Sequence, residues 1–254
     1  HAAGSVKHLM PKAGYDRGIV VLSAAAVIAD AVAEYTLGAM LSMQRQLFPY
    51  HQHLTVDRGW KGEGALPMPH ELYRKKVGIV AVGMVGRRVI ELLGPFRCDV
   101  MVYDPYLSDR ERERLGVRQV SLEELFATSD IVSVHAPSTE ETKAMITTRH
   151  FRELRDGALF INTARTWVVD REAMLEALQT GRFRAVLDVF YQEPLPADDP
   201  LRDLDNVLLT PHISGLTVES RLRLVEAIAE DVRRFFAGED LVLAVPWDRL
   251  KIMA

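Results

Sequence analysis

The stretch K-K-V-G-I-V-A-V-G-M-V-G-R-R, residues 75–88, carries the strongest local signal in this sequence. An apolar run ends in a turn that follows the pattern G-x-G-x-x-G, except that Ala81 replaces the first glycine. Gly83 and Gly86 are the second and third glycines. In such turns the first glycine permits a tight exit from a strand, the second lets the backbone approach a diphosphate, and the third lets a helix pack against the strand. We expect Gly83 and Gly86 to be irreplaceable, and Ala81 to be tolerated because its φ need not be positive.

The surroundings of this turn favour a dinucleotide. A helix that starts near Gly86 presents free N–H groups and the positive end of its dipole, which suit a diphosphate. Asp104 lies at the end of the next apolar run. A carboxylate there can accept both ribose hydroxyls of adenosine and repels a 2′-phosphate, so the sequence favours NAD over NADP. Two alternatives stay open: a plain strand-to-helix turn, and an Asp104 that only caps the Asp-Pro turn.

Short apolar runs alternate with amphipathic stretches along the chain. The runs are rich in Val, Ile and Leu, which is typical of buried parallel strands, and they cover residues 77–82, 99–103, 131–135, 158–162, 185–189 and 207–210. Helix patterns lie between them, at residues 87–93, 108–115, 121–128 and 170–180. This alternation predicts an α/β fold with a doubly wound parallel sheet of the Rossmann type, which binds ligands at the carboxyl ends of its strands.

Two longer helices flank this block. The stretch 25–47 repeats apolar residues every three or four positions, at Ile28, Val32, Tyr35, Ala39, Met43 and Leu47. The stretch 218–236 does the same with Leu222, Val225, Ile228, Val232 and Phe235. We expect both stripes to lie in the core or in a subunit interface. The first stripe and its flanking segment are too extensive for one domain to cover, so we expect a homodimer through this helix.

The composition excludes several classes of partner. The 254 residues carry a net charge of −4, with Lys and Arg scattered along the chain, so we expect no nucleic-acid and no membrane partner. Cys98 is the one cysteine, which fits a cytoplasmic location. His51 and His53 have no third ligand at a plausible spacing, so no metal is expected. His150 is expected at the surface.

Three polar residues fall where predicted strands end. They are Arg165 in F-I-N-T-A-R-T-W, Glu193 in L-D-V-F-Y-Q-E-P-L-P and His212 in L-L-T-P-H-I-S-G. Each has a simple alternative when taken singly: a solvated arginine, a loop glutamate before proline, and a loop histidine bonded to backbone.

Taken together, the motifs N-T-A-R, D-V-F-x-x-E-P and T-P-H-I-x-G resemble the NAD-dependent D-isomer-specific 2-hydroxyacid dehydrogenases. The similarity runs from about residue 18 to residue 215 and includes V-A-E-Y-T-L and R-G-W. The resemblance implies that Arg165 binds a 2-keto acid, that His212 gives or takes the proton, and that Glu193 orients His212. These roles suit the residue types, because a guanidinium forks hydrogen bonds to carboxylate and carbonyl oxygens, and a carboxylate beside an imidazole keeps it protonated near neutral pH.

The resemblance also implies contacts along the chain for cofactor and substrate. For NAD they are Gly83, Met84, Val85, Gly86, Asp104, His135, Ala136, Pro137, Thr142, Thr163, Ala164, Arg165, Asp188, His212, Ser214 and Gly215, with Asp188 on the carboxamide. An N-cap or a buried ion pair is the alternative for Asp188. For the substrate they are Gly4, Ser5, Val6 and Arg165. The sequence departs from the family at Thr166–Trp167, where bulk beside Arg165 could narrow the pocket, shift the guanidinium or pack outward.

The domain organisation follows from the same resemblance. We expect residues 1–23 to be the tail of a truncated, flavodoxin-like substrate lobe, 24–215 to be the NAD-binding domain, and 216–254 to be a helix and tail that return to the lobe. The first residue is His1, so we expect the natural N-terminus to lie upstream. The predicted function is an oxidoreductase that interconverts a 2-keto acid and a D-2-hydroxy acid. The alternative is an NAD(H)-responsive, corepressor-like binding protein with little or no catalysis.

Overall fold

A seven-stranded parallel sheet forms the body of the protein, in a computed structural model that describes residues 6, 10–64 and 66–252. The strands are β1 (Lys76–Val80), β2 (Asp99–Tyr103), β3 (Arg118–Gln119), β4 (Ile131–Val134), β5 (Leu159–Asn162), β6 (Arg184–Leu187) and β7 (Val207–Leu209). Their spatial order is β3-β2-β1-β4-β5-β6-β7. The doubly wound parallel sheet is therefore confirmed. The two-residue strand β3 was not predicted, because Arg118 and Gln119 are polar and form no apolar run.

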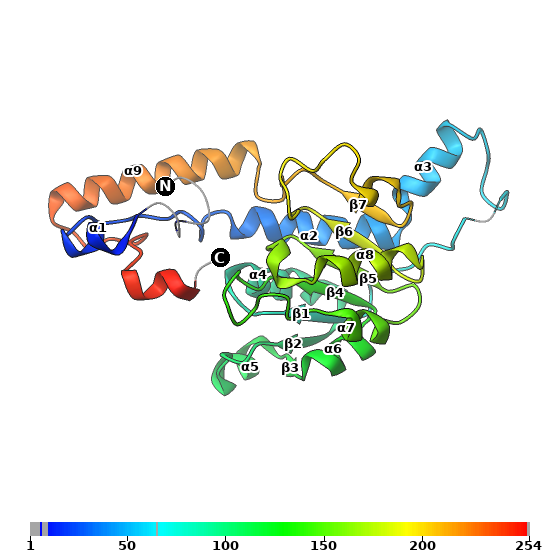
Figure 1. Cartoon of the computed structure of the whole chain (residues 1–254), viewed down its shortest axis with the longest axis horizontal. Coiled ribbons are helices and arrows are strands. Elements are labelled where there is room, and N and C mark those ends of the chain that lie inside the picture. The colour runs from blue at the N-terminus through cyan, green and yellow to red at the C-terminus, as the bar shows by residue number, and fades with distance from the viewer. Residues whose placement is uncertain (1–5, 7–9, 65, 253–254) are drawn as a thin grey trace.

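Helices cover both faces of the sheet (Figure 1). One face packs against α2 (Ala29–Gln44) and α4 (Met84–Leu93), and the other against α6 (Leu122–Thr128), α7 (Thr148–Glu153) and α8 (Arg171–Gln179). Helix α5 (Asp109–Leu115) lies beside β2 and β3. The side chains of β5 show how the sheet serves both layers: Leu159 and Ile161 join the core on one face, and Phe160 joins the core on the other. Continuous apolar strands are the result.

The first long helix is shorter than predicted. Helix α2 ends at Gln44, Gln46 adopts a left-handed φ of 56°, and α3 (Leu47–Thr55) begins a new direction. Pro49 explains the break. In a continuous helix its ring would clash with the carbonyl of Arg45, and because proline has no N–H, that carbonyl would also lose its hydrogen bond. Leu47, assigned to the stripe, is thus an exposed residue of α3.

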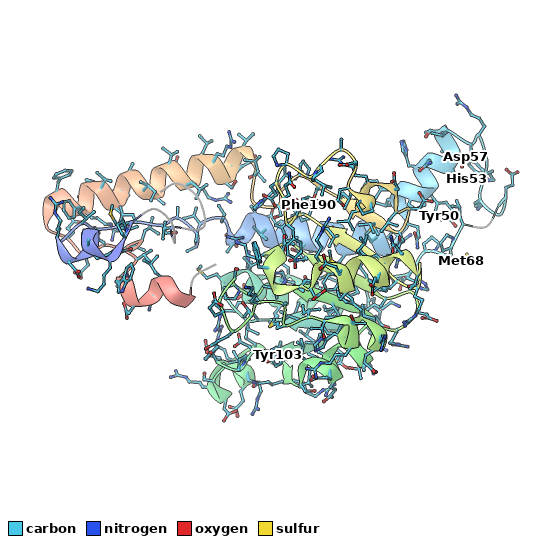
Figure 2. All side chains as sticks on the ribbon, viewed as in Figure 1. Tyr50, His53, Asp57, Met68, Tyr103 and Phe190 are labelled. Carbon is cyan, nitrogen blue, oxygen red and sulfur yellow. The ribbon has the colours of Figure 1, made fainter. Side chains whose placement is uncertain are left out.

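Residues 47–64 and 66–70 belong to an arm that leaves the body of the protein. Figure 1 shows α3 projecting from the end of α2, and Figure 2 shows Tyr50, His53, Asp57 and Met68 on this arm. Its large apolar side chains are exposed, namely Leu47, Phe48, Leu54, Val56, Trp60 and Met68. In contrast, the stripe of α2 faces the core of its own chain through residues such as Ala39, Met40 and Met43. The apolar surface exposed next to α2 therefore belongs to the arm and not to the stripe of α2.

The last long helix, α9 (Val218–Ala237), lies apart from the sheet. It ends at Ala237, one residue past the predicted stretch, and Gly238 with a φ of 72° caps it. It packs on residues 22–28 and on Leu243. Helix α1 (Lys12–Asp16) and the 3₁₀-helix η4 (Trp247–Ile252) contact each other through Tyr15 and Trp247, and Figure 1 shows them on the same side of the sheet as α9. The expected stripe is mostly exposed, since Leu222, Val225, Val232 and Phe235 all face solvent while Leu224 is buried.

The register of the sheet brings the predicted residues into one row. Neighbouring strands end at the paired positions Val80, Tyr103, Val134, Asn162, Leu187 and Leu209. The residues that follow these positions lie side by side at the carboxyl edge: Asp104, Ala81, His135, Thr163, Asp188 and Thr210. The strand order reverses between β1 and β4, which is where such sheets bind ligands.

Candidate active site

The turn after β1 has the shape of a glycine turn although it starts with alanine. Ala81 has a φ of 71°, so the expectation that this angle need not be positive is wrong. Its N–H bonds the Tyr103 carbonyl at 2.8 Å, and its own carbonyl faces Gly86, which fixes the sharp exit from β1. A left-handed conformation costs an L-residue about 1–2 kcal/mol, and the rest of the turn holds Ala81 in it.

The other two glycines differ in what surrounds them. A Cβ at Gly86 would lie well inside 3.0 Å of the Ala81 carbonyl oxygen, whereas a Cβ at Gly83 would meet no protein atom within 4 Å. Gly83 is the N-cap of α4, and the N–H groups of Met84 and Val85 have no acceptor among the described residues. Gly86 is thus needed for packing. The space beside Gly83 and the two amides are available to a ligand.

Asp104 makes two hydrogen bonds in this turn. Its Oδ2 accepts from the Val82 N–H at 2.7 Å, and its Oδ1 accepts from the Tyr106 N–H at 2.8 Å. The carboxylate therefore caps the Asp-Pro turn, as the alternative interpretation proposed, and also holds the turn after β1. Each oxygen keeps a further lone pair, so ribose hydroxyls can still be accepted.

The segment after β4 forms the other wall at the switch point. Burial lowers the pKa of His135 to about 4, and its ring Nε2 lies 3.0 Å from the Ser133 hydroxyl. Ala136 is buried and Pro137 follows it. The Thr142 hydroxyl donates to the Pro137 carbonyl at 2.6 Å, which folds the loop back on itself. Thr142 is thereby held close to His135–Pro137.

Arg165 is positioned by the side chain that ends β5. Asn162 accepts the N–H of Ala164 at 3.1 Å and donates to the Arg165 carbonyl at 3.2 Å, so it shapes the loop from both sides. The guanidinium itself donates to the Ala164 carbonyl at 2.7 Å. Burial lowers the pKa of Arg165, and the charge of Glu193 acts in the opposite direction. Arginine nevertheless stays charged in proteins, so this group remains a cation.

Glu193 and His212 form a hydrogen-bonded pair. His212 Nδ1 lies 2.7 Å from Glu193 Oε2, and Glu193 Oε1 accepts the Phe190 N–H at 3.0 Å. Burial of the Glu193 carboxyl raises its pKa, but the hydrogen bonds from His212 and Phe190 and the charges of His212 and Arg165 outweigh that and lower it. Because the carboxylate accepts, Nδ1 must donate. Nε2 is left for another partner.

Asp188 lies beneath the His212 loop. It is fully buried and forms no ion pair with a described residue, so the expected alternative of a buried ion pair is wrong for the described part of the chain. Its oxygens accept the N–H groups of Ile213 at 2.9 Å and Ser214 at 2.8 Å. Gly215 follows, and a Cβ there would touch Val32 of α2 at 3.4 Å.

The remaining predicted residues are less informative. Gly4 and Ser5 lie outside the described residues, and Val6 is buried beside Val21 and Val245. Thr163 is buried, with its hydroxyl 3.4 Å from that of Thr36.

The structure shows where Thr166 and Trp167, which differ from the family pattern, place their side chains. Trp167 is half exposed, and its ring lies edge-on to Tyr191 at 5.5 Å between centroids. Thr166 is buried and lines a cavity of about 240 Å³ together with Met174 and Phe190. Of the three expected outcomes, outward packing of the tryptophan is the one that this contact supports.

Two features concern the structure away from the carboxyl edge. A cavity of about 390 Å³ lies where β2 and β3 begin, between Asp99 and Arg118, at the opposite edge of the sheet. Within the described ranges, no three His, Cys, Asp or Glu side chains come together as metal ligands. His150, expected at the surface, is buried and accepts the Thr147 N–H that begins α7, a helix the sequence did not predict.

Sequence reasoning missed the residues that support the loops. Asn162 is the clearest example, because an asparagine directly after a buried strand is a common former of local side-chain turns. That signal was available in N-T-A-R. Phe190, whose N–H holds Glu193, gave no signal, since it acts through its backbone.

Comparison with known proteins agrees with this geometry. Residues 37–214 match the family described as D-isomer specific 2-hydroxyacid dehydrogenase, NAD binding domain. The D-3-phosphoglycerate dehydrogenase of Archaeoglobus fulgidus is 34% identical over 238 residues, which cover 93% of this chain and 45% of that protein. The glyoxylate reductase of Thermofilum pendens is 38% identical over 228 residues, 88% of this chain and 67% of that protein.

A solved structure also matches. The TT0316 protein of Thermus thermophilus superposes with a TM-score of 0.85 at 30% identity, over 96% of this chain and 77% of that one. The chain thus spans less than half of the phosphoglycerate dehydrogenase and about two thirds of the glyoxylate reductase. The chain belongs to the D-isomer specific 2-hydroxyacid dehydrogenase family and contains its NAD-binding domain.

Proposed function

We propose that this protein is an oxidoreductase that transfers a hydride between NAD(H) and a 2-keto acid/D-2-hydroxy acid pair. The observation that carries the proposal is the pair of Glu193 and His212, 2.7 Å apart, with Arg165 close enough to lower the pKa of the glutamate. These residues come from the loops after β5, β6 and β7, which are neighbours in the sheet. The arrangement supplies a cation, Arg165, and an oriented proton donor, His212, at the carboxyl edge of the sheet.

The chain's own residues fit a dinucleotide at the switch point. Met84 and Val85 would donate their amides to the diphosphate, Gly83 leaves room for its approach, and Asp104 would accept the ribose hydroxyls. The segments His135–Pro137 and Thr163–Arg165 would line the path of the cofactor. NADH, when bound, supplies the hydride that reduces the keto carbon. A 2′-phosphate would face the Asp104 carboxylate, which favours NAD.

Arg165 would bind the substrate. A 2-keto acid offers a carboxylate beside a carbonyl, and a planar guanidinium can donate two parallel hydrogen bonds to such oxygens. The same positive charge opposes the negative charge that develops on the carbonyl oxygen during reduction. Partial burial strengthens this attraction, because less water screens it.

His212 would transfer the proton. Glu193 fixes Nδ1 as a donor, so Nε2 is the nitrogen that gains or loses the transferred proton; in the imidazolium form Nε2–H would donate to the carbonyl oxygen of the substrate. As that oxygen gains charge it takes the proton from Nε2. In the oxidative direction the neutral Nε2 takes the proton of the hydroxyl group, and Glu193 stabilises the imidazolium.

Turnover with NADH tests this proposal. The absorbance of NADH should fall steadily with at least one of glyoxylate, hydroxypyruvate, pyruvate or a bulkier 2-keto acid, and faster than with NADPH. The protein should be tested both as this chain and within any longer natural chain. Tight NADH binding without turnover of any keto acid would instead favour the corepressor-like alternative.

The domain organisation stays a proposal. The exposed stripe of α9 and the cluster of Val6, Val21, Val245 and Leu250 support a second unit formed by residues 1–23 and 216–254 beside the domain of residues 24–215. A loop through Gly4, Ser5 and Val6 would then supply amides to the substrate carboxylate. None of the described helices is long and apolar enough to cross a bilayer. A cytoplasmic location stays a prediction.

We further propose that the protein is a homodimer formed through the arm. The six exposed apolar side chains on residues 47–70 support this surface in place of the stripe of α2, which its own chain covers. Sedimentation at micromolar concentration should give twice the chain mass. Phe48→Glu should give the single-chain mass, while Val225→Glu on α9 should not; a wild-type monomer would contradict the proposal.

A further inference from the structure

We infer that Tyr35 and Thr210 are positioning residues, which hold the His212 loop in its reactive geometry through the buried carboxylate of Asp188. The inference rests on the proposed function for its effect on turnover. The contacts that carry it are a chain of hydrogen bonds that starts on α2, outside the strands and loops that provide the reacting groups.

The direction of each hydrogen bond in this chain is fixed. Asp188 Oδ1 accepts from the Thr210 hydroxyl at 2.6 Å, so Thr210 has used its one proton. The Tyr35 hydroxyl lies 2.5 Å from Thr210 Oγ1 and must therefore donate to it. Burial, together with the charge of Asp188, raises the pKa of Tyr35, which keeps this donor protonated. The order is Tyr35 to Thr210 to Asp188.

Asp188 then holds both sides of the catalytic histidine. Thr210 precedes His212 by two residues, and the Ile213 and Ser214 amides follow it directly; all three donate to the same carboxylate. The His212 N–H closes the loop on the Thr210 carbonyl at 2.9 Å. One buried side chain therefore fixes the backbone on either side of the imidazole.

The histidine needs this support because its backbone is strained. His212 has a φ of 54°, in the left-handed region that an L-residue seldom adopts. Such conformations persist only where the surrounding contacts determine them. If the contacts to Asp188 weaken, the loop can relax, and the imidazole leaves its place opposite Glu193.

The neighbouring residue on α2 supports the other loop. Thr36 donates its hydroxyl proton to the Val32 carbonyl at 2.8 Å. The hydroxyl oxygens of Thr36 and Thr163 are 3.4 Å apart, and because the Thr36 proton is used, Thr163 must be the donor. Thr163 precedes Arg165 by two residues. Helix α2 thus contacts the His212 loop through Tyr35 and the Arg165 loop through Thr36. The motif V-A-E-Y-T-L places these two residues side by side.

The test compares Thr210→Val with Thr210→Ser. Valine keeps the shape and removes the hydroxyl, which takes one of two hydrogen bonds from Asp188 Oδ1 and removes the acceptor of the Tyr35 hydroxyl, whereas serine keeps the hydroxyl. We expect Thr210→Val to lower kcat about 10- to 100-fold, with KM for the keto acid and Kd for NADH within about threefold of wild type. Thr210→Ser should match wild type. Tyr35→Phe should lower kcat about three- to tenfold and keeps the test open if the valine variant does not fold.

Hydrogen–deuterium exchange gives a readout that does not depend on activity. In Thr210→Val the amides of Ile213 and Ser214 should exchange about tenfold faster or more, while amides of β1 such as Ile79 should not change. Unchanged exchange at these two amides would overturn the inference, and so would faster exchange with unaltered kcat. If wild type reduces no keto acid, the proposed function fails, and the exchange result alone decides whether Asp188 anchors the loop.

Discussion

Two glycines of the turn after β1 should respond differently to the same added methyl group. At Gly83 the backbone is nearly extended, with φ −73° and ψ −161°, and a Cβ would meet no protein atom within 4 Å. At Gly86 a Cβ would press on the Ala81 carbonyl oxygen and lie 3.5 Å from Ile79. Gly83→Ala should therefore disturb only a ligand, whereas Gly86→Ala should disturb the protein.

These contacts determine the expected changes in stability and in NADH affinity. Overpacking costs about 1–3 kcal/mol, and alanine in a helix regains about 1 kcal/mol over glycine, so Gly86→Ala should lower the free energy of unfolding by up to roughly 2 kcal/mol. Gly83→Ala should change it by less than about 0.5 kcal/mol. If its methyl group removes one hydrogen bond to the diphosphate, worth about 1.5–3 kcal/mol, Kd for NADH should rise about 10- to 100-fold.

Urea unfolding followed by circular dichroism and NADH titration followed by fluorescence measure the two quantities. Gly94→Ala is the matched control, because Gly94 ends the same helix with φ −50° and nothing lies near its Cβ position. It should leave the affinity for NADH unchanged and should not lower the free energy of unfolding, which can rise by up to about 1 kcal/mol because alanine suits a helix better than glycine. Wild-type NADH affinity in Gly83→Ala would refute the reasoning, since the dinucleotide would then not lie against this turn.

Three further predictions follow from single residues. Ala81→Gly should raise the free energy of unfolding by up to about 1 kcal/mol in urea, because relief of the left-handed strain exceeds the entropy that glycine adds to the unfolded chain; a loss of stability would contradict the assigned strain. His212→Asn should lower kcat at least about 100-fold while NADH titration shows an unchanged Kd, and full activity would refute the proton-transfer role. The pKa of His135 is lowered to about 4 in the fold and is near 6.5 when unfolded, so the unfolded chain binds the proton first as the pH falls. Stability should fall between about pH 6.5 and pH 4 by up to roughly 3 kcal/mol from this group, and chemical unfolding should find a smaller fall in His135→Gln.

The sequence predicted the sheet well because its strands are buried on both faces. Continuous Val, Ile and Leu runs located six of the seven strands. The two-residue β3 escaped, since its pairing depends on β2 and not on its own pattern. The predicted helix runs past Gln44 because its apolar periodicity continues to Leu47, whereas Pro49 ends the helix in the fold.

The family motifs placed Arg165, Glu193 and His212 on neighbouring loops, but the supports beneath them could not be derived that way. Tyr35 was assigned to an apolar stripe, and its hydroxyl contact to Thr210 appears only when α2 packs on the sheet. The positive φ of Ala81 was missed for a related reason. A residue's own type favours negative φ, and the closure of the turn overrides that preference.

A ternary complex with NAD and oxamate, an unreactive analogue of a 2-keto acid, tests the proposed site most directly. In the crystal structure, we expect Arg165 and His212 Nε2 to lie within about 3.2 Å of oxamate oxygens, with His212 Nδ1 still bonded to Glu193. The nicotinamide ring should face the carbon of oxamate that corresponds to the keto carbon of a substrate. Oxamate bound away from Arg165 and His212, or a nicotinamide that does not reach the edge formed by β5, β6 and β7, would contradict the account.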